Sequence, residues 1–344
     1  MFAYRKYREQ NRRAPAHLDS SAFKKPLGAA ERPFGLRPVP STCGGFSLLE
    51  LMVSMVILSL IMGGFISALS TSEQTYARTE LGSDMYENVR SVAELLAQEI
   101  GQAGLVSLPT TTLSAAVAAS AAVQAVNVSQ ATSMYVGEQL LVDAGSASEE
   151  LVTLTAVAST TMSGIFQHAH ASGAPVTVLG AYPSGIVPPG ATDGSTSVAE
   201  PGKSVLNMYG DINGDGSLVY IRYTCDTSAT PGTLTRSVTV ITPGVNTINT
   251  AQTLLSTLIP NPGGTPCFQY TSYPVGTPSN TYVTNVGLTI SVRSLTPDPQ
   301  TQAYLTMTKS FLDLSPRNVL AGFELGNAGL TTRLQAQPPN VSAY

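Results

Sequence analysis

The stretch Gly45-Phe-Ser-Leu-Leu-Glu-Leu-Met-Val-Ser54 opens the part of the chain that decides its fold. From Leu51 to Ser72 there is no charged residue, and Glu50 and Glu73 bracket this run. At the helical rise these residues reach about 33 Å, which is enough to cross the hydrocarbon core of a bilayer. Only a helix satisfies its own backbone groups there. The run 51–72 therefore predicts a transmembrane helix.

Two small residues stand before the apolar run rather than after it. Gly44 and Gly45 precede the apolar residues. A Sec signal peptide instead places small residues after its apolar core, where it is cleaved. A plain signal anchor or a Sec signal would thus account for the run but not for the residues in front of it.

Charge is divided sharply between the two sides of the run. Residues 1–45 carry nine Lys or Arg against three acids, a net charge of +6, whereas the remainder carries −10. Basic segments beside an apolar helix stay in the cytoplasm, so the acidic bulk is expected outside it. Because little basic surface is left after residue 45, no nucleic-acid contact is expected.

The residues at 45–54 resemble the motif of type IV prepilins. The resemblance implies that a prepilin peptidase cuts after Gly45 on the cytoplasmic side and N-methylates Phe46. It matches the glutamate at the fifth mature position to Glu50, and it implies packing against other pilins through the N-terminal helix. The expected protein is thus single-pass in the inner membrane lipid, with a cytoplasmic N-terminus, before it joins an extracytoplasmic filament.

The chemistry of Glu50 can be argued from the residues themselves. A carboxylate at the middle of a membrane helix costs about 2.5–3.5 kcal/mol on insertion scales, so such a group persists where a partner offsets the cost. After cleavage the free amine of Phe46 is the nearest cation, since no Lys or Arg follows before Arg78. Two interpretations stay open: Glu50 pairs with that amine, in its own chain or a neighbour, or it snorkels to the headgroups.

The helix is predicted to continue past the membrane, from residue 47 to about 104. An apolar stripe repeats at intervals of three and four residues, and acidic residues fall on the opposite face. The stripe consists of Leu81, Met85, Val89, Val92, Leu96, Ile100 and Ala103, and the acidic face of Glu73, Glu80, Glu87 and Glu94. Gly63-Gly64 is a candidate flexible point.

After the helix, β-branched residues at period two predict strands. These are expected at 134–142, 150–157, 174–179, 204–209, 217–224, 233–241, 283–293 and 303–311. Pro/Gly-rich residues at 181–202 and 260–281 predict long exposed loops. Residues 113–131 are expected to form a surface helix or linker, and 134–179 a small inserted β module.

The predicted fold class is α+β. A long N-terminal helix, membrane-spanning in its first half, carries a C-terminal antiparallel β-rich globular head. The expected parts are a cleaved basic leader at 1–45, the helix at 46–104 with its transmembrane part at 51–72, and the head at 105–344.

Cysteine usage agrees with an exported head. Cys43 lies in the leader, which leaves Cys225 and Cys267. Two cysteines in an oxidising compartment predict one disulfide, and two buried free thiols are the alternative.

Three further patterns bear on chemistry. Asp211, Asn213 and Asp215 match the start of a calcium loop, but Arg222 stands where its bidentate glutamate belongs, so an Asp/Asn/Gly turn without metal is favoured over a Ca²⁺ site. The pair His168 and His170 is expected in a solvated turn. No nucleophile elbow or phosphate-binding loop occurs, so neither an enzyme nor a cofactor is expected.

The head also resembles PilW-type minor pilins in three segments. These are Leu-Leu-Ala-Gln-Glu-Ile-Gly-Gln-Ala-Gly at 95–104, Asp-Ile-Asn-Gly-Asp-Gly at 211–216 and Phe-Leu-Asp-Leu-Ser-Pro-Arg-Asn at 311–318. The resemblance implies a minor pilin that initiates or caps a type IV pilus. A pseudopilin of a type II secretion system, or a tip-displayed adhesin or DNA-uptake module, remains an alternative.

Overall fold

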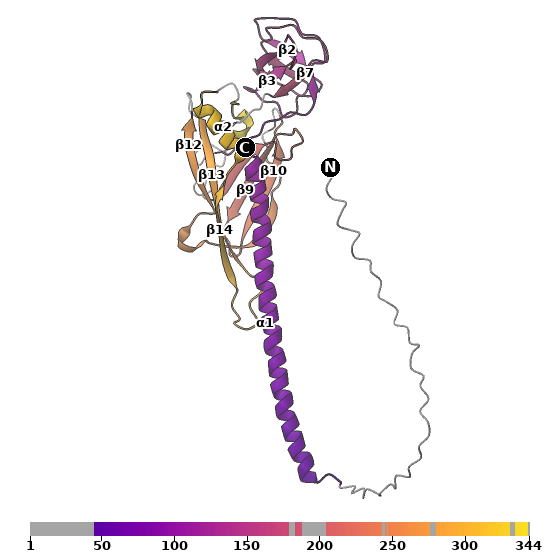
Figure 1. Cartoon of the computed structure of the whole chain (residues 1–344), viewed down its shortest axis with the longest axis vertical. Helices are drawn as coiled ribbons and strands as arrows, with labels where there is room; N and C mark the ends of the chain where they lie inside the picture. The colour runs from indigo at the N-terminus through magenta and orange to yellow at the C-terminus, as the bar shows by residue number, and fades with distance from the viewer. Residues whose placement is uncertain are drawn as a thin grey trace, which may run out of the picture. The chain divides into compact units, whose positions relative to one another are not determined.

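The computed structural model divides the chain into two compact units, one ending at Met62 and one beginning at Gly63. Figure 1 labels the helices and strands and colours them by residue number. Each unit is considered by itself. The structure describes residues 45–178, 183–187, 204–242, 245, 247–275, 280–330 and 334–342.

The helix α1 spans Leu48–Gln102 and is 55 residues long. It continues through Gly63-Gly64 without interruption. It is long and apolar enough to cross a membrane, and within the described residues it is the one helix that meets this condition. Residues 48–73 are all exposed, and the buried residues begin at Met85.

The amphipathic stripe predicted for the second half of α1 is confirmed. Met85, Val89, Leu96 and Ile100 are buried, and the acidic face opposite them is exposed. Because residues three and four apart share one face of a helix, this stripe presents a continuous apolar surface to the head.

The head is built on a seven-stranded antiparallel sheet. Its strands are β8 (Val205–Gly210), β9 (Val219–Asp226), β10 (Gly232–Val240), β11 (Gln252–Ile259), β12 (Phe268–Val275), β13 (Asn280–Arg293) and β14 (Thr306–Leu314). The order is β12-β13-β11-β10-β9-β8, and β14 also pairs with β13. β13 is long enough to pair with β12 along its first part and with β11 near its end.

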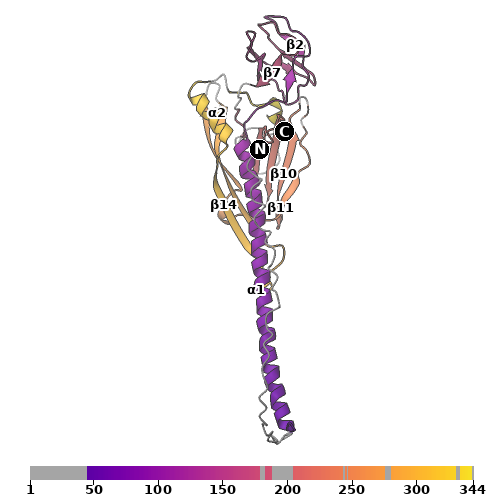
Figure 2. The same ribbon diagram turned by 45° about the vertical axis from the view of Figure 1, so that its right-hand side comes forward.

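The core of the head lies between α1 and this sheet. The buried helix stripe shares one apolar cluster with residues of the strands, including Ile221, Leu258 and Leu288. Figure 2 shows α1 between β14 on one side and β10 and β11 on the other. Since the stripe would otherwise face water, its burial is what holds the helix to the head.

A second set of strands forms between α1 and β8. It consists of β1 (Thr111–Thr112), β2 (Gln124–Asn127), β3 (Gln139–Val142), β4 (Glu150–Thr153), β5 (Ala156–Val157), β6 (Thr161–Gly164) and β7 (Pro175–Val178). They form a four-stranded sheet, β1-β7-β3-β4, and a three-stranded one, β2-β6-β5, around a separate apolar cluster. We call residues 111–178 the β module.

Two expectations for the head are wrong, and a third lies mostly outside the described residues. Residues 113–131 form neither a helix nor a linker, because they supply β2 and the buried Leu113, Val126 and Val128. The region 260–281 is not one long loop, since it contains the short 3-10 helix η1 (Pro262–Gly264) and β12. Of the loop expected at 181–202, only 183–187 lies within the described residues.

Two short helices near the C-terminus were not expected from the sequence. The helix α2 spans Arg317–Asn327, and a 3-10 helix, η3, spans Pro339–Ser342. Val319 of α2 is fully buried in the core of the head.

Candidate functional site

The start of α1 is fixed by Ser47. The backbone N–H of Glu50 donates a hydrogen bond of 3.2 Å to Ser47 Oγ, so Ser47 caps the helix that begins at Leu48. Ser-x-x-Glu is a capping-box sequence, and it satisfies a backbone donor that the first turn leaves unpaired. The spacing of Ser47 and Glu50 could have predicted this cap.

Gly45 and Phe46 lie just outside this cap. A Cβ atom added at Gly45 would meet nothing within 4 Å, so the fold itself does not require glycine there. The Phe46 side chain is 79% exposed. A glycine that packing does not demand, beside an accessible peptide bond, is what a protease that reads small residues needs.

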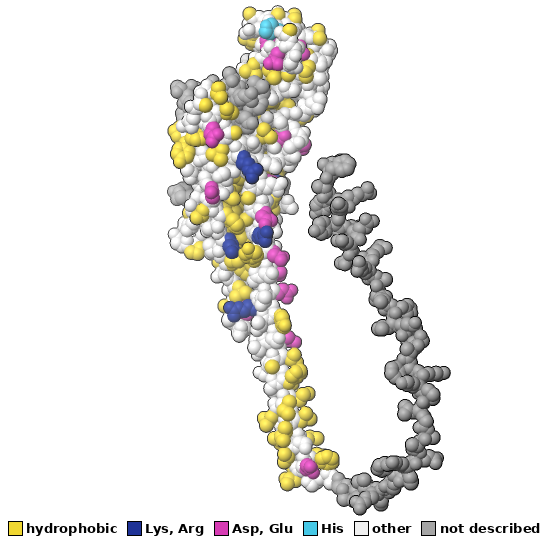
Figure 3. All heavy atoms as spheres, viewed as in Figure 1, with side chains coloured by type: hydrophobic (Ala, Val, Ile, Leu, Met, Phe, Trp, Pro, Cys, Tyr) yellow, Lys and Arg dark blue, Asp and Glu magenta, His cyan; other side chains and the backbone are white. Residues whose placement is uncertain are grey.

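Glu50 is exposed in the first turn of α1. Within the described residues its carboxylate has neither a hydrogen bond nor an ion pair. Figure 3 shows apolar side chains covering the helix beyond an acidic side chain near its start. The carboxylate is thus available to a cation that the mature terminus or another molecule supplies.

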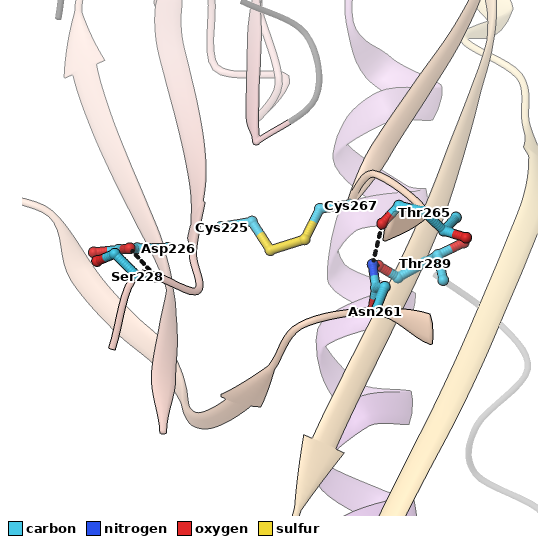
Figure 4. Close-up of a disulfide and its surroundings, with 7 residues drawn as sticks. All are labelled: Cys225, Asp226, Ser228, Asn261, Thr265, Cys267 and Thr289. Carbon is cyan, nitrogen blue, oxygen red and sulfur yellow. Dashed lines mark hydrogen bonds between the residues drawn. A yellow bond between two sulfur atoms is a disulfide. The ribbon is translucent and has the colours of Figure 1, made fainter. Parts of the chain in front are cut away.

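Cys225 and Cys267 form a disulfide, as expected (Figure 4). Cys225 lies in β9 and Cys267 just before β12, with their Cα atoms 6.5 Å apart, and both residues are buried. Nearby, Asn261 Nδ2 donates to the carbonyl oxygens of Thr265 at 3.1 Å and Thr289 at 2.9 Å. The segment before β12 is therefore tied both to β9 and to β13.

The turn at 211–216 is organised around the buried carboxylate of Asp211. Its two oxygens accept hydrogen bonds from the backbone N–H groups of Gly214, Asp215 and Gly216 at 2.8, 3.1 and 3.1 Å, and from the hydroxyl of Ser107. An Asp side chain that bonds the backbone of its own turn needs no metal to hold it. Asn213 lies in the same turn, and no group of three metal-ligating side chains occurs among the described residues.

The two histidines differ, contrary to the expectation of one solvated turn. His168 is exposed, but the His170 side chain is fully buried, with its Nε2 2.6 Å from Glu150 Oε1. Glu150 also accepts the backbone N–H of Gln167 at 2.7 Å. This carboxylate therefore holds the segment 167–170 inside the β module.

A buried polar contact that sequence reasoning missed joins α1 to the sheet. Glu99 is only 5% exposed, and its carboxylate accepts hydrogen bonds from the Tyr223 hydroxyl and from the Arg236 guanidinium, with Nε to Oε2 at 3.2 Å. Burial, with the neighbouring negative charge of Glu99, raises the pKa of Tyr223 well above its usual value. Tyr223 therefore acts as a neutral donor.

The C-terminal end of α1 is held by residues from two later parts of the chain. Asn318 Nδ2 donates to the Gln102 carbonyl at 3.0 Å, which satisfies an acceptor that a helix end leaves free. The Gly104 N–H donates to the Tyr209 carbonyl at 3.0 Å. Gly104 has a φ of +83°, and a Cβ there would lie 2.9 Å from Val319, so only glycine fits.

Comparison with known proteins identifies the N-terminal part of the chain. Residues 40–66 match the family model described as the prokaryotic N-terminal methylation motif, which is the type IV prepilin signal. This match, with the apolar helix that follows, supports a membrane-anchored, single-pass, type IV pilin-like protein. Searches of curated proteins and of solved structures found no match.

Proposed function

We propose that this protein is a minor pilin, which enters a type IV pilus after cleavage and helps to initiate or cap its assembly. The match at residues 40–66 carries the proposal, because it joins the processing signal directly to a helix of 55 residues. The first half of that helix is exposed and apolar, while the second half packs into the head. A filament of such subunits would bury the first half.

Glu50 is the residue that would register one subunit against another. Its carboxylate is exposed in the first helical turn, four residues from the amine that cleavage would create at Phe46. In an apolar surrounding, a carboxylate and an amine attract each other strongly, and each offsets the desolvation of the other. The amine of one chain and Glu50 of a neighbour would therefore meet in the filament.

The role as a minor pilin is supported by three segments that lie near the C-terminal end of α1. The segments 95–104, 211–216 and 311–318 resemble PilW-type minor pilins and lie far apart in sequence. Asn318 of the third segment contacts Gln102 of the first, and Asp211 of the second contacts Ser107, which follows the end of the helix. The three segments both resemble PilW-type minor pilins and lie near the same helix end. Together they form a more specific pattern than any one of them alone.

Filament recovery tests the proposal. A strain that lacks the protein should lose surface pili and regain them with the wild type. Glu50→Ala should insert into the membrane as the wild type does, since it removes a charge from an apolar helix, but should be depleted from sheared filaments. Glu73→Ala, at the other end of the uncharged run, is the matched control and should be recovered normally. Equal recovery of Glu50→Ala and wild type in sheared filaments would refute the pairing. If the strain that lacks the protein has normal pili but loses protein secretion, a pseudopilin would be favoured.

The β module supports a second candidate, a binding role for the displayed head. Residues 111–178 enclose their own apolar cluster, separate from the one that packs on α1. A unit with its own core is not needed to hold the helix. Under this candidate, changes to exposed side chains of the module, such as Leu151 and Ile165, would reduce adhesion or DNA uptake and leave piliation intact.

A further inference from the structure

The turn between β13 and β14, residues 294–305, contacts α1 through Arg78. Arg78 Nε lies 3.7 Å from Asp298 Oδ2, and Arg78 Nη1 lies 3.5 Å from Gln300 Oε1. Arg78 is the first basic residue after the uncharged run that ends at Ser72. The turn therefore meets the helix close to the point where the helix would leave the membrane.

The depth of this contact follows from helix geometry. Arg78 is six residues beyond Ser72, which corresponds to about 9 Å along the axis. Helical side chains point back toward the N-terminus, so the guanidinium lies nearer to the membrane than its Cα atom does. The headgroup layer on each side of the hydrocarbon core is roughly 5–7 Å thick. Arg78 and the part of the turn that touches it thus lie at headgroup level.

The turn has the chemistry of a membrane interface. Its one charged residue, Asp298, is fully buried and accepts hydrogen bonds from the backbone N–H of Gln300 at 3.0 Å and from Thr301 Oγ1 at 2.9 Å. Its exposed side chains are therefore uncharged, and they include Leu295 and Tyr304, which are 75% and 43% exposed. Beside a membrane span, a turn without exposed charge brings no ion to the edge of the hydrocarbon core, where a charge is costly.

Amphipathic side chains flank the turn on both elements. Tyr76 of α1 is 74% exposed, and the Arg293 guanidinium lies over the ring of Tyr304 at 4.3 Å. Tyrosine is enriched where a protein crosses from lipid to water, and arginine places its stem in lipid with its charge at the phosphates. Tyr76 and Arg78 of α1, Tyr304 of the turn and Arg293 at the end of β13 are side chains of these two kinds.

We propose that the β13–β14 turn rests in the lipid headgroup layer while the protein is anchored in the membrane. The occupant of this surface is the phosphate-bearing face of the bilayer that α1 spans. The head is then held at two places, the helix and the turn, and cannot rotate freely about the helix axis. The inference rests on membrane anchoring alone, so it stands or falls separately from a role in a pilus.

The test measures how close the turn lies to lipid in the full chain. Cys43→Ser removes the leader thiol, and Ala303→Cys then places a single reactive thiol in the turn for a fluorescent label. Ala147→Cys, an exposed alanine in the β3–β4 turn of the β module, is the matched control. The labelled proteins are reconstituted in vesicles of phosphatidylcholine and phosphatidylglycerol that carry a nitroxide at the headgroup.

The label at position 303 should lose most of its emission to the nitroxide, and the label at 147 should not. Arg78→Gln should weaken quenching at 303, whereas Arg90→Gln, which alters an exposed pair with Glu94 on the same helix, should leave it unchanged. Equal quenching at 303 and 147 would overturn the proposal. Cross-linking of position 303 to a second copy in the same vesicles, without quenching, would overturn it as well and assign the turn to a neighbouring subunit.

Discussion

Glu99 of α1 and Arg236 of β10 form an ion pair in the interface between helix and sheet, although they are 137 residues apart in sequence. The side chain of Glu99 is 6% exposed and that of Arg236 is 21% exposed. Tyr223 of β9 donates to the same carboxylate. One acidic side chain on the buried stripe therefore connects the helix to two neighbouring strands.

Removing the charge of Glu99 should loosen this connection. Glu99→Gln leaves the partly buried guanidinium of Arg236 without its counter-ion, so we expect the free energy of unfolding to fall by about 2–3 kcal/mol, between the costs at exposed and at fully buried pairs. Glu94→Gln alters an exposed pair with Arg90, which water screens, and should cost much less than Glu99→Gln. Urea unfolding of the two variants measures the difference, and equal losses would contradict the assignment.

A second buried carboxyl predicts how stability depends on pH. Glu138 is fully buried in the head, and its Oε1 has no hydrogen-bond partner among the described residues, while Oε2 accepts the Tyr135 N–H at 3.2 Å. Burial raises the pKa of Glu138 well above its usual value. A buried group near it is the phenol of Tyr135, which is neutral because burial raises its pKa well above the usual value. The folded protein therefore binds this proton more tightly than the unfolded chain does.

The folded-state pKa of Glu138 is raised, so its protonation stabilises the folded protein. This stabilisation is complete below the unfolded pKa of about 4.3, and it is lost as pH rises through the folded pKa. The free energy of unfolding should fall by up to about 1.4 kcal/mol per pH unit in that window. Glu138→Gln should flatten this slope, and Glu87→Gln, an exposed residue of α1, should not. An unchanged slope in Glu138→Gln, measured by urea unfolding from pH 4 to 8, would disprove the effect.

The disulfide should contribute substantially to the stability of the head. Cys225 and Cys267 are 42 residues apart, and the closure of a loop of this length corresponds to about 4 kcal/mol in the chain-entropy model. Denaturant unfolding with and without reductant measures this contribution. Thiol labelling of both cysteines in protein isolated without reductant would show that the bridge does not form in the exported chain.

The Asp211 turn should be stabilising without calcium. Asp211→Ala would leave several backbone donors unpaired and should lower the free energy of unfolding by about 2–3 kcal/mol. The exposed carboxylate of Asp215 accepts the Ser217 N–H at 2.8 Å, its one partner within the part of the chain that the structure describes, so Asp215→Ala should cost less than about 1 kcal/mol. We expect millimolar calcium to leave the Tm unchanged. A rise in Tm with calcium that is lost in Asp215→Ala would establish a metal site instead.

What the sequence could predict depends on how local each feature is. The stripe from Met85 to Ile100 is visible because its period of three and four lies within one segment. The buried contacts of Glu99 could not be predicted in this way, since its partners lie more than 120 residues away in the sequence. The strand β12 is mostly exposed and shows no alternating burial, so period-two reasoning could not find it.

The β module shows the same limit. The sequence predicts strands that overlap β3, β4, β5 and β7, but β1, β2 and β6 have only two to four residues, too few for a period to be read. The processing segment is the opposite case, because its features are adjacent in the sequence. The glycine, Phe46, Glu50 and the uncharged run can be recognised without knowledge of any tertiary contact. The cap by Ser47 was visible as well, in the spacing of Ser47 and Glu50.

The N-terminus of the mature protein is the most direct test of the account. We expect mass spectrometry of the membrane and sheared fractions to find a chain that begins at Phe46 with one methyl group on its amine. Gly45→Leu should abolish this product without unfolding the protein, because a side chain at residue 45 meets nothing in the fold. A stable protein that retains residues 1–45, or one that begins beyond Ser72, would contradict the assignment as a processed, pilin-like subunit.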